Sequence, residues 1–141
     1  MACIWLSGKE DAKLRYYQRQ KHNPYILPKP VYVQTIWQIK GYHMLKERID
    51  DIINSTPTPD GMPRGSGISD PTAAKGTKIA KFQSVVNVIE EEHKKIPEEY
   101  RTGVWNSIMY STRFPDDADV STYSRHKSRF IYNVAIRLGF Y

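Results

Sequence analysis

Apolar side chains recur at intervals of mostly three and four residues in four stretches of the 141-residue chain. That spacing places them on one face of an α-helix. The pattern predicts helices over residues 31–54, 71–95, 97–110 and 121–138. We therefore predict an all-α fold, in which a long helical hairpin is followed by a C-terminal helix-turn-helix.

The first two predicted helices form the hairpin, and a turn-rich segment separates them. Residues 55–70 hold three prolines and three glycines, a composition typical of a loop. Asp70 is placed to cap the second helix, and Pro71 to occupy its first position. The apolar seam of that helix fits either an antiparallel hairpin within one chain or a coiled coil with a second chain. Gly41 is a weak point of the first helix, which close packing of another helix would explain.

The predicted helices divide the chain into three regions. Residues 1–29 carry six basic and two acidic side chains, and their prolines break the helical pattern. We predict that they form a basic N-terminal arm that is mobile or loosely docked. Residues 30–95 form the two-helix hairpin, and residues 96–141 form a helix-turn-helix DNA-binding domain.

The C-terminal stretch from Ser121 to Tyr141 predicts a helix with two different faces. At about 100° per residue, one arc is apolar and the opposite arc is polar. The apolar arc consists of Tyr123, Phe130, Ile131, Val134, Ala135 and Leu138. The polar arc consists of Thr122, Arg125, His126, Arg129 and Asn133. Such polar side chains reach phosphates and base edges, so we predict a DNA-reading helix. Lys127 lies on the apolar arc and is expected to extend past the core toward solvent.

The net charge of +6 is concentrated at the two ends of the chain. Residues 120–141 carry four basic side chains and no acidic one, and the N-terminal region is basic as well. Neutralisation of phosphates by Lys and Arg drives nucleic-acid binding, so this distribution favours DNA contact at the ends. The alternative interpretation is a basic domain whose charge serves solubility alone.

Several classes of protein are not indicated. The chain has no run of eighteen apolar residues, so we predict no membrane contact. The single Cys3 excludes an internal disulfide and a cysteine-based zinc cluster. The four histidines lack metal-ligand spacing, and His93 is expected at the surface. No nucleophile–base arrangement or paired carboxylates indicate an enzyme, and we expect no metal or cofactor.

Three segments of the chain resemble small proteins encoded in phages and prophages of Gram-positive bacteria. They are YILPKPVYVQTIWQIKGY (25–42), DGMPRGSGISDPT (60–72) and IPEEYRTGVWNSIMYSTRFPDDADVSTYSRHKSRFIYNVAIRLGFY (96–141). These proteins are grouped with the RinA/ArpU-like phage transcriptional activators, whose C-terminus is similar to the promoter-binding helix-turn-helix of sigma factors.

The resemblance implies that residues 97–110 form the first helix of that motif and residues 121–138 the recognition helix. The implied DNA contacts are Thr122, Tyr123, Arg125, His126 and Arg129. Between the two helices this chain departs from the sigma pattern, because the acidic string RFPDDAD (113–119) replaces the scaffold helix.

The expected function is therefore sequence-specific DNA binding that regulates phage or prophage genes, as an activator of late genes acting near RNA polymerase in the bacterial cytoplasm. Expected partners are double-stranded DNA, host RNA polymerase and a second copy bound through residues 31–54 and 71–95. The alternatives are a small terminase-type DNA-packaging subunit or another helical assembly protein, and a sigma-like adaptor that binds polymerase. A further alternative is that the polar arc is only the solvated face of a packing helix.

Overall fold

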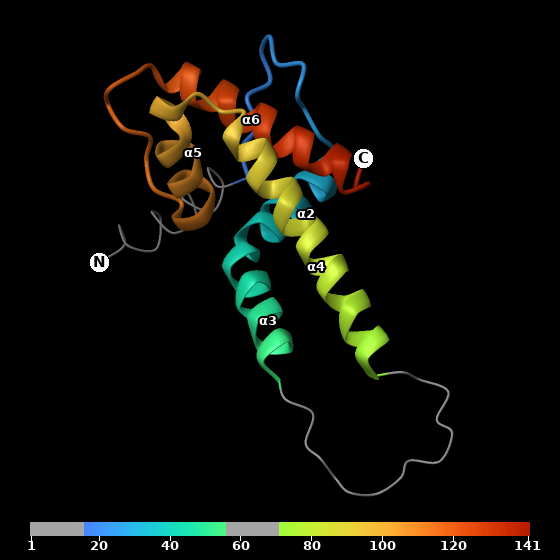
Figure 1. Ribbon diagram of the computed structural model, residues 1–141. Coiled ribbons are helices and arrows are strands. Elements are labelled where there is room, and N and C mark those ends of the chain that lie inside the picture. The colour runs from blue at the N-terminus through green and yellow to red at the C-terminus, as the bar shows by residue number, and fades with distance from the viewer. Residues whose placement is uncertain (1–15, 56–70) are drawn as a thin grey trace, which may run out of the picture.

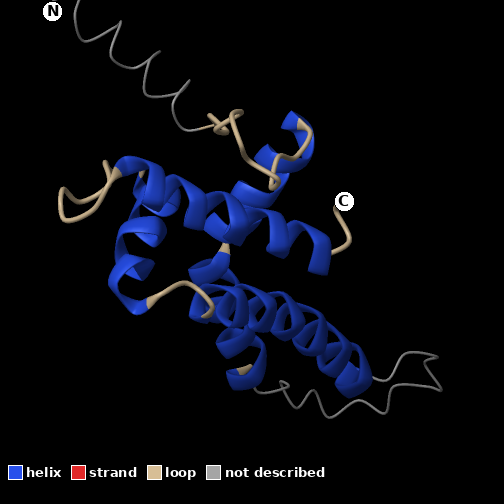
Figure 2. Ribbon diagram, turned by 90° about the horizontal axis from the view of Figure 1, so that it is seen from above, coloured by secondary structure: helices blue, strands red, loops and turns tan. Residues whose placement is uncertain are grey.

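The computed structural model describes residues 16–55 and 71–141, and these residues form an all-helical protein. The helices are α2 (Lys29–Lys40), α3 (Tyr42–Asn54), α4 (Pro71–Lys94), α5 (Glu98–Tyr110) and α6 (Val120–Arg137). Within the described ranges every regular element is a helix (Figure 2). The predicted fold class is confirmed. Among the helices described, none combines the length and the apolar character that crossing a membrane would require.

The predicted helix over residues 31–54 is wrong, because it is two helices that meet at Gly41. This glycine has φ −77° and ψ 1°, whereas a helical residue has ψ near about −42°. The two helices consequently run in different directions (Figure 1). A Cβ at Gly41 would meet the carbonyl oxygens of Gln38 and Trp37 at 3.4 and 3.6 Å and Met44 Cε at 3.8 Å. All these atoms belong to α2 and α3, so the expected close packing of another helix at Gly41 is also wrong.

Helices α3 and α4 pair antiparallel and extend together from the rest of the molecule (Figure 1). Ile49 of α3 and Val86 and Ile89 of α4 are buried. The apolar seam therefore closes within one chain, as in the first of the two predicted alternatives. The predicted loop over 55–70 and the capping residue Asp70 lie outside the described residues, apart from Ser55.

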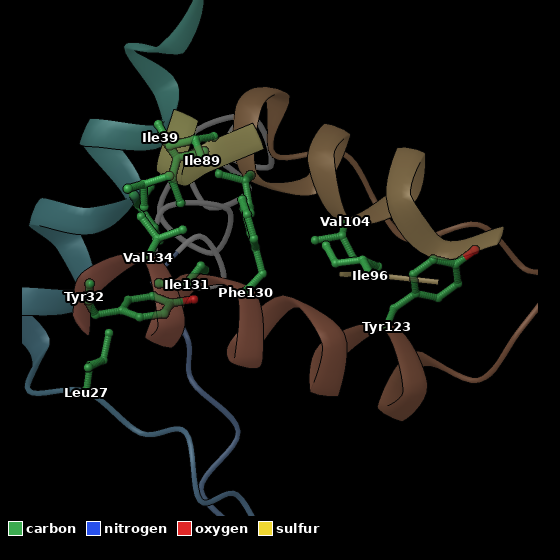
Figure 3. Close-up of a cluster of buried hydrophobic side chains, with 14 residues drawn as sticks. Leu27, Tyr32, Ile39, Ile89, Ile96, Val104, Tyr123, Phe130, Ile131 and Val134 are labelled. Atoms are coloured by element: carbon green, nitrogen blue, oxygen red, sulfur yellow. The ribbon is translucent and has the colours of Figure 1, made fainter. Parts of the chain in front are cut away.

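Helix α6 lies at the centre of the packing and contacts α2, α4 and α5. Figure 3 shows its apolar side chains meeting those of the other helices. Its buried apolar residues are Tyr123, Phe130, Ile131, Val134 and Ala135, and Leu138 packs partly buried at the edge. This is the predicted apolar arc. The same cluster includes Leu27, Tyr32 and Ile39, so the predicted hairpin and the predicted DNA-binding region share one core.

Residues 16–28 are docked against the helices, which corrects the predicted mobile or loosely docked arm for this part of the chain. The Gln18 side chain donates to Leu27 O and accepts from Leu27 N, both at 2.8 Å. Leu27 is buried in the core. Asn23 Nδ2 donates to Ser128 Oγ of α6 at 3.4 Å. The remainder of the predicted arm, residues 1–15, lies outside the described residues.

A glycine sets the distance between α5 and α6. A Cβ on Gly103 of α5 would lie 2.6 Å from Tyr123 Cε1 and 2.9 Å from Pro115 Cδ. Real Cβ atoms do not approach other atoms so closely. The absence of a side chain at Gly103 thus allows the Tyr123 ring of α6 and the loop before α6 to pack directly on α5.

We predict that Gly103→Ala lowers the free energy of unfolding by about 1–3 kcal/mol, since overpacking outweighs the gain in helix propensity. The matched control is Gly76→Ala in α4, where a Cβ would meet nothing within 4 Å. That variant should gain up to about 1 kcal/mol. Urea unfolding followed by circular dichroism measures both. Stabilisation by both substitutions would contradict the close approach at Gly103.

We predict that Phe130→Ala lowers the free energy of unfolding by about 3–5 kcal/mol, because Phe130 is 2% exposed and its removal leaves a cavity. Ile136→Ala on the same helix serves as the control, since Ile136 is 43% exposed. Its cost should stay below about 1 kcal/mol. Equal costs for the two substitutions in chemical denaturation would show that α6 is not oriented as described.

Candidate nucleic-acid interface

The polar arc of α6 lies on the side of the helix that faces away from the core. Arg125 and Arg129, one helical turn apart, are exposed. Thr122, His126 and Asn133 are half-buried beside them. The structure therefore brings five of the six predicted contact residues onto one face of one helix.

Tyr123 is the exception, and its prediction as a DNA contact is wrong for this structure. The residue is 0% exposed, and its ring stacks on Phe114 with centroids 5.1 Å apart. Its hydroxyl donates to Asp117 Oδ1 at 2.6 Å. This hydrogen bond, followed by burial, raises the pKa of Tyr123 to about 12. Tyr123 is a core residue with a satisfied polar end, consistent with its place on the apolar arc.

Other basic side chains near α6 form ion pairs or hydrogen bonds within the protein. Arg137 contacts Glu91 Oε2 at 2.6 Å and Glu92 Oε1 at 3.3 Å, which ties the end of α6 to α4. Lys95 contacts the same Glu92 oxygen at 2.8 Å. Arg101 donates to the carbonyls of Ile96 and Lys94, near the C-terminal end of α4. Arg137 and Lys95 are therefore paired with carboxylates, and Arg101 is hydrogen-bonded to backbone carbonyls.

Arg125 and Arg129 differ from these residues because they are not engaged. Within the part of the chain that the structure describes, neither forms an ion pair or a hydrogen bond through its guanidinium group. A guanidinium group offers five N–H donors and always carries its charge. The two side chains therefore present free positive charge and free donors to solvent on adjacent turns.

His126 adds a neutral polar group to this face. Its ring stacks on Tyr100 of α5, with centroids 4.9 Å apart and an interplanar angle of 21°. Burial, followed by the charges of Arg125 and Arg129, lowers the pKa of His126. The imidazole is consequently neutral at pH 7 in the free protein and acts as a hydrogen-bonding group instead of a cation.

A small pocket borders this face of α6. It has a volume of about 10 Å³ and is lined by Glu92, Lys95, Ile96, His126, Arg129, Phe130 and Asn133. Cavities that bind organic ligands measure about 300–1,000 Å³. This pocket is therefore much smaller than the usual site of an organic ligand. No group of three or more metal-ligating side chains occurs among the described residues.

Acidic residues surround the N-terminal end of α6. Asp119 occupies the N-cap position, and Asp116 and Asp117 lie exposed in the preceding turn. Carboxylates stabilise a helix N-terminus through the helix dipole, but they repel phosphate. A phosphate bound at Thr122 and the helix N-terminus would thus be electrostatically unfavourable. The favourable positive potential lies farther along the helix, at Arg125 and Arg129.

The segment between α5 and α6 does not confirm a helix-turn-helix. Residues 111–119 join the two helices, whereas the motif uses a turn of about three or four residues. The chain leaves α5 through Ser111, which adopts the left-handed conformation with φ 56°. Residues 116–118 form a turn and a bend, so no helix lies between α5 and α6 in this segment.

A second basic element borders α6, and its position was not predicted. The contact between Asn23 and Ser128 anchors the N-terminal segment, and Tyr25 packs edge-on against Tyr132 of α6 at 5.5 Å. Lys21 is exposed close to these contacts in the chain. The excess of basic residues near the N-terminus was visible in the sequence, but its docking beside α6 was not.

Comparison with models of known protein families, with curated proteins and with solved structures finds no match to this chain. The resemblance to RinA/ArpU-like activators therefore stays a prediction.

Lys127 lies between α5 and α6 and does not extend freely into solvent as expected. Its Nζ donates to Ser107 Oγ at 3.1 Å and lies 5.8 Å from the centroid of the Phe114 ring. Burial, followed by the charge of Lys40, lowers the pKa of Lys127 to about 8. An unfolded lysine has a pKa of about 10.4, so the unfolded chain binds this proton more tightly than the folded protein does.

We predict that Lys127→Met raises the melting temperature by about 2–5 °C at pH 7, because it removes the cost of charging a half-buried amine. That cost is fully present below the folded pKa of about 8 and fades as pH rises to about 10.4. The gain should therefore shrink toward zero at about pH 10. Melting of the exposed control Lys78→Met should show no such trend, and an equal gain for Lys127→Met at both pH values would contradict the shifted pKa.

Proposed function

We propose that this protein binds double-stranded DNA through the exposed face of α6. The observation that carries the proposal is the pair of exposed, unpaired guanidinium groups of Arg125 and Arg129. They stand on a helix whose opposite face is fixed in the core. A rigid helix with free arginines on successive turns fits the backbone or the major groove of DNA, into which an α-helix can enter.

In the proposed complex, each kind of side chain would contact a different part of the DNA. Arg125 and Arg129 reach phosphate oxygens or the O6 and N7 acceptors of guanine. Asn133 and neutral His126 add polar contacts at the edge of the same face, and Lys21 of the docked N-terminal segment adds a phosphate contact beside it. The acidic turn before α6 keeps the helix N-terminus away from the phosphates. DNA therefore lies along the middle of α6 in this proposal.

The biological role we propose is regulation of phage or prophage genes, as an activator near host RNA polymerase. This part rests on the resemblance of residues 25–42, 60–72 and 96–141 to RinA/ArpU-like activators. The proposed role is non-enzymatic, and the proposed location is the cytoplasm of the bacterial host. Selection of bound duplexes from a random pool, followed by footprinting of the recovered site, tests whether binding is sequence-specific.

The projecting hairpin of α3 and α4 supports a second candidate, a helical assembly protein such as a small DNA-packaging subunit. Its exposed apolar side chains include Met44 and Ile53, at 67% and 62% exposure. Such side chains on a projecting element fit contact with further copies. Mass measurement by light scattering separates the two candidates, because a ring of many subunits favours packaging and a monomer or dimer favours regulation.

We predict that replacing both Arg125 and Arg129 with Ala lowers DNA affinity at least about tenfold at low salt, since two phosphate or base contacts are lost. The melting temperature should stay within a few degrees because both side chains are exposed. The matched control is Lys78→Ala with Lys81→Ala, which removes the same charge from the exposed face of α4.

The control pair should keep most of its affinity and most of the dependence of binding on salt. Fluorescence anisotropy with a labelled duplex measures all three proteins. Equal loss in the two double variants would mean that binding follows net charge alone, and the assignment of the α6 face would be wrong.

A further inference from the structure

A second site lies away from α6, where α3, α4 and α5 meet. A cavity of about 220 Å³ is lined by Tyr42, His43, Ile89, Glu90, His93 and Trp105. Four of these six side chains are aromatic rings and one is a carboxylate. None belongs to α6 or to the proposed DNA contacts.

The rings meet at steep angles and line the cavity. The Trp105 ring lies 5.3 Å from Tyr42, with an interplanar angle of 87°, and 5.1 Å from His93, with an angle of 66°. His43 completes the set at 6.2 Å from Trp105. Ile89, which Figure 3 shows within the core cluster, is fully buried and contributes an apolar wall. The rings therefore pack edge-to-face against one another, and we call this cluster of Tyr42, His43, His93 and Trp105 the aromatic cage.

The electrostatics of the cavity favour a positive charge. Glu90 supplies a carboxylate whose Oε1 accepts a hydrogen bond from the Tyr42 hydroxyl. Burial, followed by that hydrogen bond, raises the pKa of Tyr42 to about 12, so the phenol stays neutral. Burial lowers the pKa of His93, which keeps this ring neutral as well and corrects its expected place at the surface. Faces of neutral aromatic rings attract cations.

One lysine of the protein contacts two of the residues that line this cavity. Lys46 Nζ lies 5.4 Å from the centroid of the Tyr42 ring and 3.9 Å from Glu90 Oε1. Its side chain is 52% exposed and is not among the lining residues, so it lies outside the cavity on the surface of α3. A cation that enters the cavity would compete with Lys46 for Glu90.

The size and the surroundings of the cavity limit the class of ligand that it can bind. Its volume is below the roughly 300–1,000 Å³ of pockets that hold drug-sized molecules, so it suits a single side chain. His43 and the following Met44 are exposed, and Met44 offers apolar surface to a polypeptide. We propose that this cage binds a lysine side chain of a partner protein, with the ammonium between Glu90 and the faces of Tyr42 and Trp105.

The test uses the full chain with Trp5→Phe and Trp37→Phe, which leaves Trp105 as the single tryptophan fluorophore. Three probes are titrated: tetramethylammonium chloride, a short lysine-containing peptide with blocked ends, and the same peptide acetylated at Nε. Sodium chloride controls for ionic strength. We expect saturable fluorescence changes with the first two probes at about millimolar concentration, as for a single-group contact, and none with the acetylated peptide.

Two substitutions should move the affinity in opposite directions. Glu90→Gln should weaken binding of the lysine peptide at least about fivefold, because the carboxylate is lost and the shape is kept. Lys46→Gln should tighten it by removing the internal competitor. A purely structural role for these residues would not give opposite effects. The variant lacking Arg125 and Arg129 should bind the peptide normally, so this site and the proposed DNA interface are tested independently.

The proposal is overturned if neither cationic probe saturates, or if the acetylated peptide binds as well as the charged one. It is also overturned if tetramethylammonium binds and the lysine peptide does not, because the site would then take a free small cation.

Discussion

The packing of the apolar face of α6 against α2, α4 and α5 is the constraint on which the rest of the structure depends. Val134 and Phe130 of α6 meet side chains that the chain supplies from well before residue 96. The interior of a protein is close-packed, so a helix held on three sides has little freedom to rotate. Its outward face is therefore determined by what it buries.

The basic side chains near α6 fall into two groups: some are paired with carboxylates inside the protein, and others are exposed without a partner among the described residues. Arg137 and Lys95 meet at Glu92, which is buried at 2% side-chain exposure between α4 and α6. A carboxylate buried to this degree requires positive partners, and these two supply them. Arg125 and Arg129 pair with no carboxylate among the described residues. Their guanidinium groups therefore stay exposed on the outward face of α6, and this is the face for which we propose DNA as the partner.

Much of the fold could be predicted from the sequence because helical periodicity is a local signal. The apolar arc of residues 121–138 and the start of α4 at Pro71 both follow from spacing and capping rules. The break at Gly41 is different, since the glycine was visible but its backbone angle depends on how α2 and α3 pack. The role of Gly103 could not be predicted, because Tyr123 lies twenty positions away and only the interhelical distance brings them together.

In the candidate site too, some features follow from the local sequence pattern and others depend on how the helices pack. Arg125, His126 and Arg129 were predictable from the polar arc, whereas the pairing of Arg137 required knowing that α4 lies alongside. Tyr123 was assigned to DNA because the resemblance implied it, although periodicity also placed it in the core. The aromatic cage could not be predicted from the sequence, because its residues come from three helices and share no motif.

We propose that DNA lies on the outward face of α6. A titration of the isotope-labelled protein with a short duplex, followed by backbone amide NMR, tests it most directly. We expect the largest shifts at Arg125, Arg129 and Asn133 and in the docked segment around Lys21. Shifts concentrated in the α3–α4 hairpin, or no shifts at low salt, would contradict it.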